Sequence, residues 1–138
     1  ARSDAFSIWT GSRLLVWGGS GASNSLLSDG AMFDPSQNVW TALAVSPLSA
    51  RSASPFGSGW AVLSGASVFL LGGVGESVAY QDSSRFDTSV SQWLQLPPWF
   101  PVSEHRAGIG VWTGKEFIVW SGFDGSTLSD GGSRWLAQ

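Results

Sequence analysis

The residues best suited to chemistry lie together in one short segment. Glu104, His105 and Arg106 are consecutive, and His105 is the only histidine in the chain. An imidazole beside a carboxylate and a guanidinium is the arrangement that general acid–base catalysis uses. The chain has no cysteine, which excludes disulfides, thiolate nucleophiles and sulfur-ligated zinc or iron within these residues.

Other charged residues recur along the chain. Arginines occur near the start of three similar segments, and aspartates follow each of them downstream: Arg2, Arg51, Arg106, Asp29, Asp82 and Asp130. A catalytic residue would more often occur once. The recurrence therefore predicts structural hydrogen bonds from arginine to carboxylate or carbonyl oxygens, which hold the loops in place.

A second group of residues suits binding. Trp99 and Phe100 lie between prolines in "LPPWFPVSEHR", and exposed aromatic rings on a stiff loop would anchor a protein partner. The alternative is that both rings cap neighbouring structural units. The candidate binding residues on this loop face are Trp99, Phe100, Glu104, His105, Tyr80, Phe123 and Asp124. Asp124 and Asp130 share one loop but lack further oxygen ligands, so we predict no metal site.

Composition excludes several classes of partner. The chain has 138 residues and a net charge of −3, without a run of Lys or Arg that would follow a phosphate backbone, so we expect no nucleic acid. Hydrophobic residues make up 43% and charged residues 12%, which indicates a globular chain. Its apolar runs, such as "LLVW", are of strand length, so we predict no transmembrane segment.

The elements that must position these residues form an internal repeat. Three segments align: "SIWTGSRLLVWGG", "AVLSGASVFLLGG" and "GVWTGKEFIVWSG". In each, an apolar run meets a Thr-Gly or Ser-Gly turn, and the turn glycines Gly11, Gly65 and Gly114 are 54 and 49 residues apart. Downstream, the first two copies also share Phe-Asp and then a tryptophan, Trp40 or Trp93.

Each copy has the pattern of short antiparallel strands. The second run is continuously apolar, which is typical of a strand covered on both faces. The third carries Phe-Asp before a turn, and the fourth presents its tryptophan in an alternating pattern. Gly and Ser interrupt every window long enough for a helix. The sequence therefore predicts an all-β chain of four-stranded antiparallel meanders.

These registered motifs resemble kelch repeats, in particular the bacterial type with Trp-Thr-Gly and Trp-Gly-Gly. The resemblance implies a β-propeller with blades at residues 2–47, 51–97 and 104–138, of which the third lacks its fourth strand. It also implies a structural role for His105, because such repeats often have a polar residue near the start of the first strand. Closed propellers use typically 4 to 8 blades, so we expect an incomplete ring. A longer chain, a second copy or another subunit would complete it.

We expect a non-catalytic module for protein interaction or assembly, without a cofactor. A carbohydrate-binding face is the second hypothesis, since tryptophan among Ser, Asn and Asp suits sugars. A third is an enzyme: kelch-like relatives include a copper radical oxidase and a sialic acid mutarotase. The oxidase requires a Tyr–Cys cross-link, which this chain cannot form. A mutarotase would require Arg51, Arg106, Glu76 and Glu104 to converge.

Two features of the sequence bear on the cellular compartment. The surface is rich in Ser and Gly, and the chain starts at Ala1 without Met. Both features favour a processed, exported protein, periplasmic or secreted.

Overall fold

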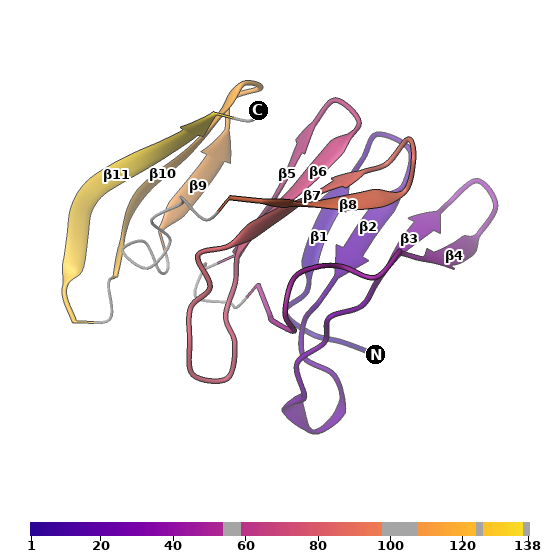
Figure 1. Cartoon of the computed structure of the whole chain (residues 1–138), viewed down its shortest axis with the longest axis horizontal. Coiled ribbons are helices and arrows are strands. Elements are labelled where there is room, and N and C mark those ends of the chain that lie inside the picture. Colours follow the sequence, from indigo (N-terminus) through magenta and orange to yellow (C-terminus); the bar gives the residue numbers. More distant parts are fainter. Residues whose placement is uncertain (54–58, 98–107, 124–125, 137–138) are drawn as a thin grey trace.

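A computed structural model describes residues 1–53, 59–97, 108–123 and 126–136. The described residues form three antiparallel sheets, which lie side by side in chain order (Figure 1). The first sheet has the strand order β1-β2-β3-β4, with β1 (Phe6–Trp9), β2 (Leu14–Trp17), β3 (Gly30–Asp34) and β4 (Val39–Ala42). A short 3-10 turn, η1 (Ala22–Asn24), lies in the loop between β2 and β3.

The second and third sheets repeat this arrangement. The second has the order β5-β6-β7-β8, with β5 (Gly59–Ser64), β6 (Ser67–Gly72), β7 (Ser83–Asp87) and β8 (Gln92–Leu96). The third has three described strands, β9 (Ile109–Trp112), β10 (Glu116–Phe123) and β11 (Leu128–Leu136), in the order β11-β10-β9. None of the sheets is closed. The prediction of an all-β chain built from antiparallel meanders is confirmed.

The repeated glycines make the tight turns between the first two strands of each sheet. Gly11, Gly65 and Gly114 have φ of +96°, +58° and +97°, a conformation that side chains with a Cβ rarely adopt. In the first and third sheets the preceding threonine closes the turn: the Thr10 N–H donates to the Arg13 carbonyl at 2.8 Å, and the Thr113 N–H donates to the Glu116 carbonyl at 2.9 Å. These three glycines therefore permit the backbone conformation of the turns.

Two hydrophobic cores join the three sheets. The first lies between the first and second sheets, and its buried members are Phe6, Leu15, Trp17, Met32, Leu48, Val68, Leu70 and Phe86. The second lies between the second and third sheets and contains Val62, Phe69, Leu71, Phe117, Val119 and Trp135. Because side chains alternate along a strand, each sheet has two faces that pack independently. The middle sheet uses both of them.

We call the face that points toward the next sheet in chain order the forward face, and the opposite one the back face. The forward face of the first sheet includes Phe6, Ile8, Leu15 and Trp17, and that of the second includes Trp60, Val62, Phe69 and Leu71. The back face of the second sheet includes Ala61, Leu63, Val68, Leu70, Phe86 and Trp93, and that of the third includes Trp112, Phe117, Val119 and Trp135. Both internal interfaces therefore join a forward face to a back face.

The expectation that every second strand is covered on both faces holds only for the middle sheet. In β6, the residues from Val68 to Gly72 are all buried. In β2 and in the first part of β10, buried residues alternate with more exposed ones. The physical reason is that the first and third sheets have a described neighbour on one side only. An apolar strand thus reveals what a face is suited to contact, but not whether the contact is made.

Candidate functional site

The back face of the first sheet is an uncovered aromatic surface. Its strand register places Trp9, Leu14, Phe33 and Trp40 in one row across all four strands. Trp9 is 50% exposed and Trp40 is 55% exposed. The rings of Phe33 and Trp40 lie 5.0 Å apart between centroids and contact each other at a tilt of 35°. We call this surface, completed by Ser7 and Val16, the first end face.

The forward face of the third sheet is uncovered in the same way. Ile109 is 74% exposed, Val111 53%, Ile118 37% and Trp120 58%. The register pairs Trp120 with Ile109 and Ile118 with Val111, so the four side chains form one contiguous apolar group on β9 and β10. We call this group the second end face. An ion pair lies at its edge, with 3.8 Å between an Arg134 nitrogen and a Glu116 carboxylate oxygen.

The two end faces are suited to contacts that remove apolar side chains from water. The residues that define the two end faces are not ionisable, but Arg134 pairs with Ile118 in the strand register and so lies on the same face of the third sheet, where it contacts Glu116. Contiguous exposed apolar surface on a soluble protein commonly marks a site of protein contact. Large aromatic residues such as Trp9, Trp40 and Trp120 supply much of the binding free energy in such contacts. These surfaces are therefore the strongest candidate for a functional site in the described part of the chain.

Two of the recurring arginines, Arg2 and Arg51, lie between the loops, at the end of the sheets opposite the hairpin turns. Arg51 is fully buried, and both of its terminal nitrogens donate to the carboxylate of Asp82, one of them to Oδ2 at 3.0 Å. The same guanidinium donates to the carbonyls of Ser49 and Gly72, at 2.9 and 3.2 Å. It also lies over the ring of Tyr80, 3.8 Å from the centroid. A guanidinium engaged this fully holds the loops together.

Arg2 makes the corresponding contacts in the first sheet. Its guanidinium donates to the carbonyls of Gly18 and Asp29, at 2.7 and 3.0 Å, and to the Asp29 carboxylate at 3.1 Å. The Arg2 side chain is 25% exposed and that of Asp29 is 72% exposed. In the third sheet Asp130 is exposed on β11. Arg106, its expected partner, lies outside the described residues.

A broad depression lies between the loops of the first two sheets. It has a volume of about 590 Å³ and is lined by Ser25, Leu26, Ser49, Ala50, Glu76, Ser77, Val78 and Tyr80. This volume falls within the range of ligand pockets, about 300–1,000 Å³. The lining offers hydroxyls, one carboxylate and one aromatic ring. Such a set can hydrogen-bond a polyhydroxylated ligand.

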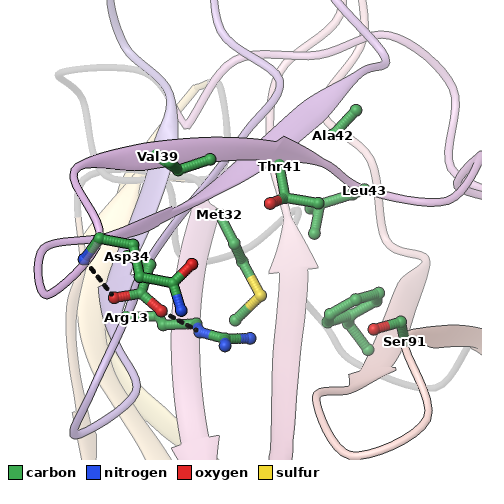
Figure 2. Close-up of a pocket in the computed structure, with 10 residues that line it drawn as sticks. Arg13, Met32, Asp34, Val39, Thr41, Ala42, Leu43 and Ser91 are labelled. Carbon is green, nitrogen blue, oxygen red and sulfur yellow. Dashed lines mark hydrogen bonds and ion pairs between the residues drawn. The ribbon is translucent and has the colours of Figure 1, made fainter.

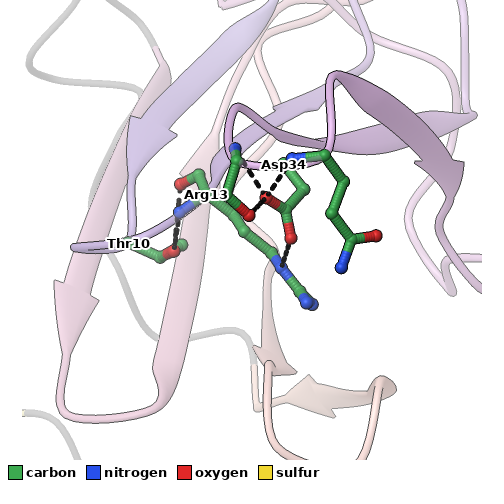
Figure 3. A network of polar contacts seen from close by, with 5 residues as sticks. Thr10, Arg13 and Asp34 are labelled. Atoms are coloured by element: carbon green, nitrogen blue, oxygen red, sulfur yellow. Dashed lines mark hydrogen bonds and ion pairs between the residues drawn. The ribbon is translucent and has the colours of Figure 1, made fainter.

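A network of polar side chains at the hairpin turns of the first sheet was not predicted from the sequence. Nε of Arg13 donates to Oδ2 of Asp34 at 3.2 Å, and the Thr10 hydroxyl donates to the Arg13 carbonyl at 2.9 Å (Figure 3). The only available signal was that Arg13 departs from the repeat, which has Ser67 and Glu116 at the matching positions. Arg13 also lines a small pocket against Met32 and Val39 (Figure 2).

The two pockets beside these hairpin turns are smaller than an ordinary ligand site. The pocket at Met32 has a volume of about 100 Å³, and the adjoining one beside Thr10 and Thr88 has about 290 Å³. Both lie below the usual range of roughly 300–1,000 Å³. The Asp34 carboxylate is also already engaged, because Oδ1 accepts from Ser36 and Gln37 in its own turn and Oδ2 accepts from Arg13 in the preceding hairpin turn. We therefore assign this network to the support of the β3–β4 turn.

Hydrogen bonds lower the pKa of two turn aspartates. The Ser36 hydroxyl donates to Oδ1 of Asp34 at 2.6 Å and lowers the pKa of that carboxyl below its ordinary value, with help from backbone N–H groups and Arg13. In the next sheet the Ser89 hydroxyl donates to Oδ1 of Asp87 at 2.5 Å and lowers the pKa of Asp87 in the same way. Both carboxylates act as acceptors in their turns.

The remaining predicted residues are dispersed. Phe123 is 38% exposed at the end of β10. Trp93 is half-buried, with its ring 6.2 Å from that of Trp17 and its Nε1 donating to the Ala44 carbonyl at 3.0 Å. The other predicted binding residues lie outside the described part of the chain, namely Trp99, Phe100, Glu104, His105 and Asp124. The single described arginine–glutamate pair is at the edge of the second end face, not at Arg51.

Among the described residues, no three His, Asp or Glu side chains gather in a way that could hold a metal ion. Within the same ranges, no helix is both long and apolar enough to cross a bilayer. No protein-family model matches the chain, and no curated protein matches it either.

Proposed function

We propose that this chain is a non-catalytic, kelch-like propeller segment that acts as a protein-assembly module, and that it docks its partners through the two end faces. The observation that carries the proposal is the exposure of apolar side chains at positions that are buried elsewhere in the repeat. Trp120 is 58% exposed, whereas its counterparts Trp17 and Leu71 are 0% and 1% exposed. The end faces thus have the composition of internal interfaces.

The energetics favour covering both end faces. Burial of a fully exposed Val or Ile side chain contributes roughly 1.5–3 kcal/mol. Ile109 and Val111, which are 74% and 53% exposed, would contribute a corresponding part of that free energy. Several such side chains on one flat sheet face provide a surface that a complementary sheet or loop can desolvate. Exposed apolar faces of this kind also promote unspecific association when they are left uncovered.

The absence of cysteine provides a direct test, because one introduced thiol is a unique label. Val111→Cys places the thiol on the second end face, and Lys115→Cys places it on the neighbouring exposed turn as a matched control. In the cells that make the protein, a maleimide should label the thiol at 111 several-fold more slowly than the thiol at 115. Equal labelling of the two positions in the folded protein would show that nothing docks on this face, and would refute the proposal.

A second candidate function, carbohydrate binding, rests on the depression beside Tyr80. Its three serines, Glu76 and one aromatic ring are the groups that bind sugar hydroxyls and stack on sugar rings. Glycan binding that is lost in Glu76→Gln and retained in Glu116→Gln would support it. If glycans bind and both variants retain the binding, this location is wrong.

A further inference from the structure

The two end faces correspond to the two halves of the interface that this chain repeats internally. Residues of the second end face occupy the same repeat positions as the forward faces: Ile109 corresponds to Phe6 and Trp60, and Ile118 to Leu15 and Phe69. Residues of the first end face occupy the positions of the back faces. The strand pairings support this alignment, because Leu14 pairs with Phe33, Val68 with Phe86, and Phe117 with Trp135.

We infer that the second end face binds the first end face of a second copy of this chain, in a head-to-tail arrangement. The inference rests on the proposed assembly function and names its partner. The chain itself presents a back face of the type that receives a forward face twice within it. A second copy therefore offers a matched surface, and a reciprocal contact would cover all four end faces of the pair.

The internal interfaces predict which side chains would meet. Trp60 and Phe117 lie 5.5 Å apart between ring centroids, and by the repeat this contact becomes Ile109 against Leu14 of the second copy. Phe69 and Trp135 lie 4.9 Å apart, which translates into Ile118 against Phe33.

A further ring contact across an internal interface gives a third predicted pair. Trp17 and Trp93 lie 6.2 Å apart, which translates into Trp120 against Trp40 of the second copy. All three predicted pairs are apolar. Arg134 lies opposite Ile118 on the same face, and its ion pair with Glu116 would be retained in the contact.

A close contact between two sheets of the chain indicates two positions that a cross-linker could join. Gly110 lies so near the Trp60 side chain that a Cβ on it would come within 2.5 Å of the indole nitrogen. The repeat translates this approach into Ile109 against Ser7 of the second copy. Ser7 is exposed and Ile109 is 74% exposed, so cysteine at either position removes little packing within one copy, although Ile109→Cys shortens one side chain of the predicted contact. A homogeneous face-to-face pair would instead bring Ile109 near Ile109.

The experiment mixes two purified single-cysteine proteins, Ile109→Cys and Ser7→Cys, and adds a bis-maleimide that spans the ~10 Å spacing of packed sheets. We expect a covalent dimer of twice 14.5 kDa from the mixture, and little from either protein alone. A mixture of Lys115→Cys and Ser7→Cys is the matched control, since position 115 lies on the turn. Adding Trp120→Ser to the Ile109→Cys protein should reduce the cross-linked fraction several-fold.

Each other result would overturn the inference. Efficient cross-linking of Ile109→Cys to itself would show a face-to-face pair with the wrong polarity. Equal yields from the 109 and 115 mixtures would show unspecific collision. No cross-linked dimer from folded proteins, checked by circular dichroism, together with a monomeric unaltered chain in sedimentation equilibrium, would exclude a second copy as the occupant.

If no dimer forms, the proposed function is still tested separately by the labelling experiment in cells. A chain that is monomeric when pure, but protected at position 111 in cells, would dock a different protein. A chain unprotected in cells would refute both statements.

Discussion

Arg2 and Arg51 occupy the same place in two copies of the repeat, and their surroundings differ. Each donates to a carbonyl at the end of the second strand, Gly18 or Gly72, and to the carboxylate of a downstream aspartate. Yet the Arg51 side chain is fully buried, whereas that of Arg2 is 25% exposed. The same local motif is therefore a loop contact in one sheet and a buried ion pair in the other.

The neighbouring sheet makes this difference. The Gly19 N–H of the first sheet donates to the Arg51 carbonyl at 2.8 Å, and the Arg51 N–H donates to the Leu27 carbonyl at 3.1 Å. Arg51 is thus enclosed between the loops of two sheets. Arg2 is near the first end face and has no described sheet before it. Burial in this molecule comes from stacking sheets rather than from any one repeat.

The largest expected effect is the difference between Arg51→Ala and Arg2→Ala. Removing Arg51 leaves the Asp82 carboxylate and the Gly72 carbonyl without their donor in a largely dry site, which should cost about 3–4 kcal/mol of unfolding free energy. Removing Arg2 breaks a more exposed pair and should cost no more than about 1 kcal/mol. Urea denaturation of both variants measures the two costs. Similar losses would mean that burial does not separate the two sites.

A comparison of Leu71→Ala with Trp120→Ala tests the sheet faces directly. Leu71 is 1% exposed in the core between the second and third sheets, so its truncation should cost about 3 kcal/mol. Trp120 is the matching residue of the third sheet, and at 58% exposure its loss in dilute protein should change stability by about 1 kcal/mol or less. A large cost at Trp120 in a monomeric sample would contradict the assignment of an open face.

The fourth-strand tryptophans should show a smaller difference. Trp93 contacts both Trp17 and Phe86, with ring centroids 6.2 and 4.9 Å away, and Trp93→Ala should cost about 2 kcal/mol. Trp40 contacts Phe33 and is otherwise open, so Trp40→Ala should cost about 1 kcal/mol in dilute protein. If the first end face is covered by a partner, the cost of Trp40→Ala should rise in the assembled state. A cost that is independent of assembly would argue against that coverage.

The smallest expected effect is the loss of stability at low pH, and it should be similar in the first and second sheets. The hydroxyls of Ser36 and Ser89 hold the pKa values of Asp34 and Asp87 below their ordinary value. A lowered folded pKa adds stability that is present above the unfolded pKa, about 4, and is lost as pH falls through the folded pKa. NMR titration of Ser36→Ala should show the pKa of Asp34 rising toward its ordinary value, with Asp87 unchanged. A shift at both aspartates would show that the turns are coupled.

The repeats made much of the fold accessible from sequence. Thr-Gly turns, apolar second strands and Phe-Asp turns recur, so their alignment predicts antiparallel meanders without any coordinates. The expected contact of Arg51 with a carboxylate followed from the same recurrence. The exposure of Trp120 did not follow, because its repeat position is identical to that of Trp17 and only the neighbouring sheet distinguishes them. Arg13 was missed because it belongs to no repeat.

The most direct measurement of the central claim is backbone hydrogen exchange in the three second strands, β2, β6 and β10. In dilute, purified protein β6 should exchange most slowly, because it alone of the three is covered on both faces in the described structure. In the assembled state β2 and β10 should slow toward β6, while the turns at Gly11 and Gly114 stay unchanged. If β2 and β10 exchange equally fast with and without the native assembly, the end faces are not docking surfaces, and the account is wrong.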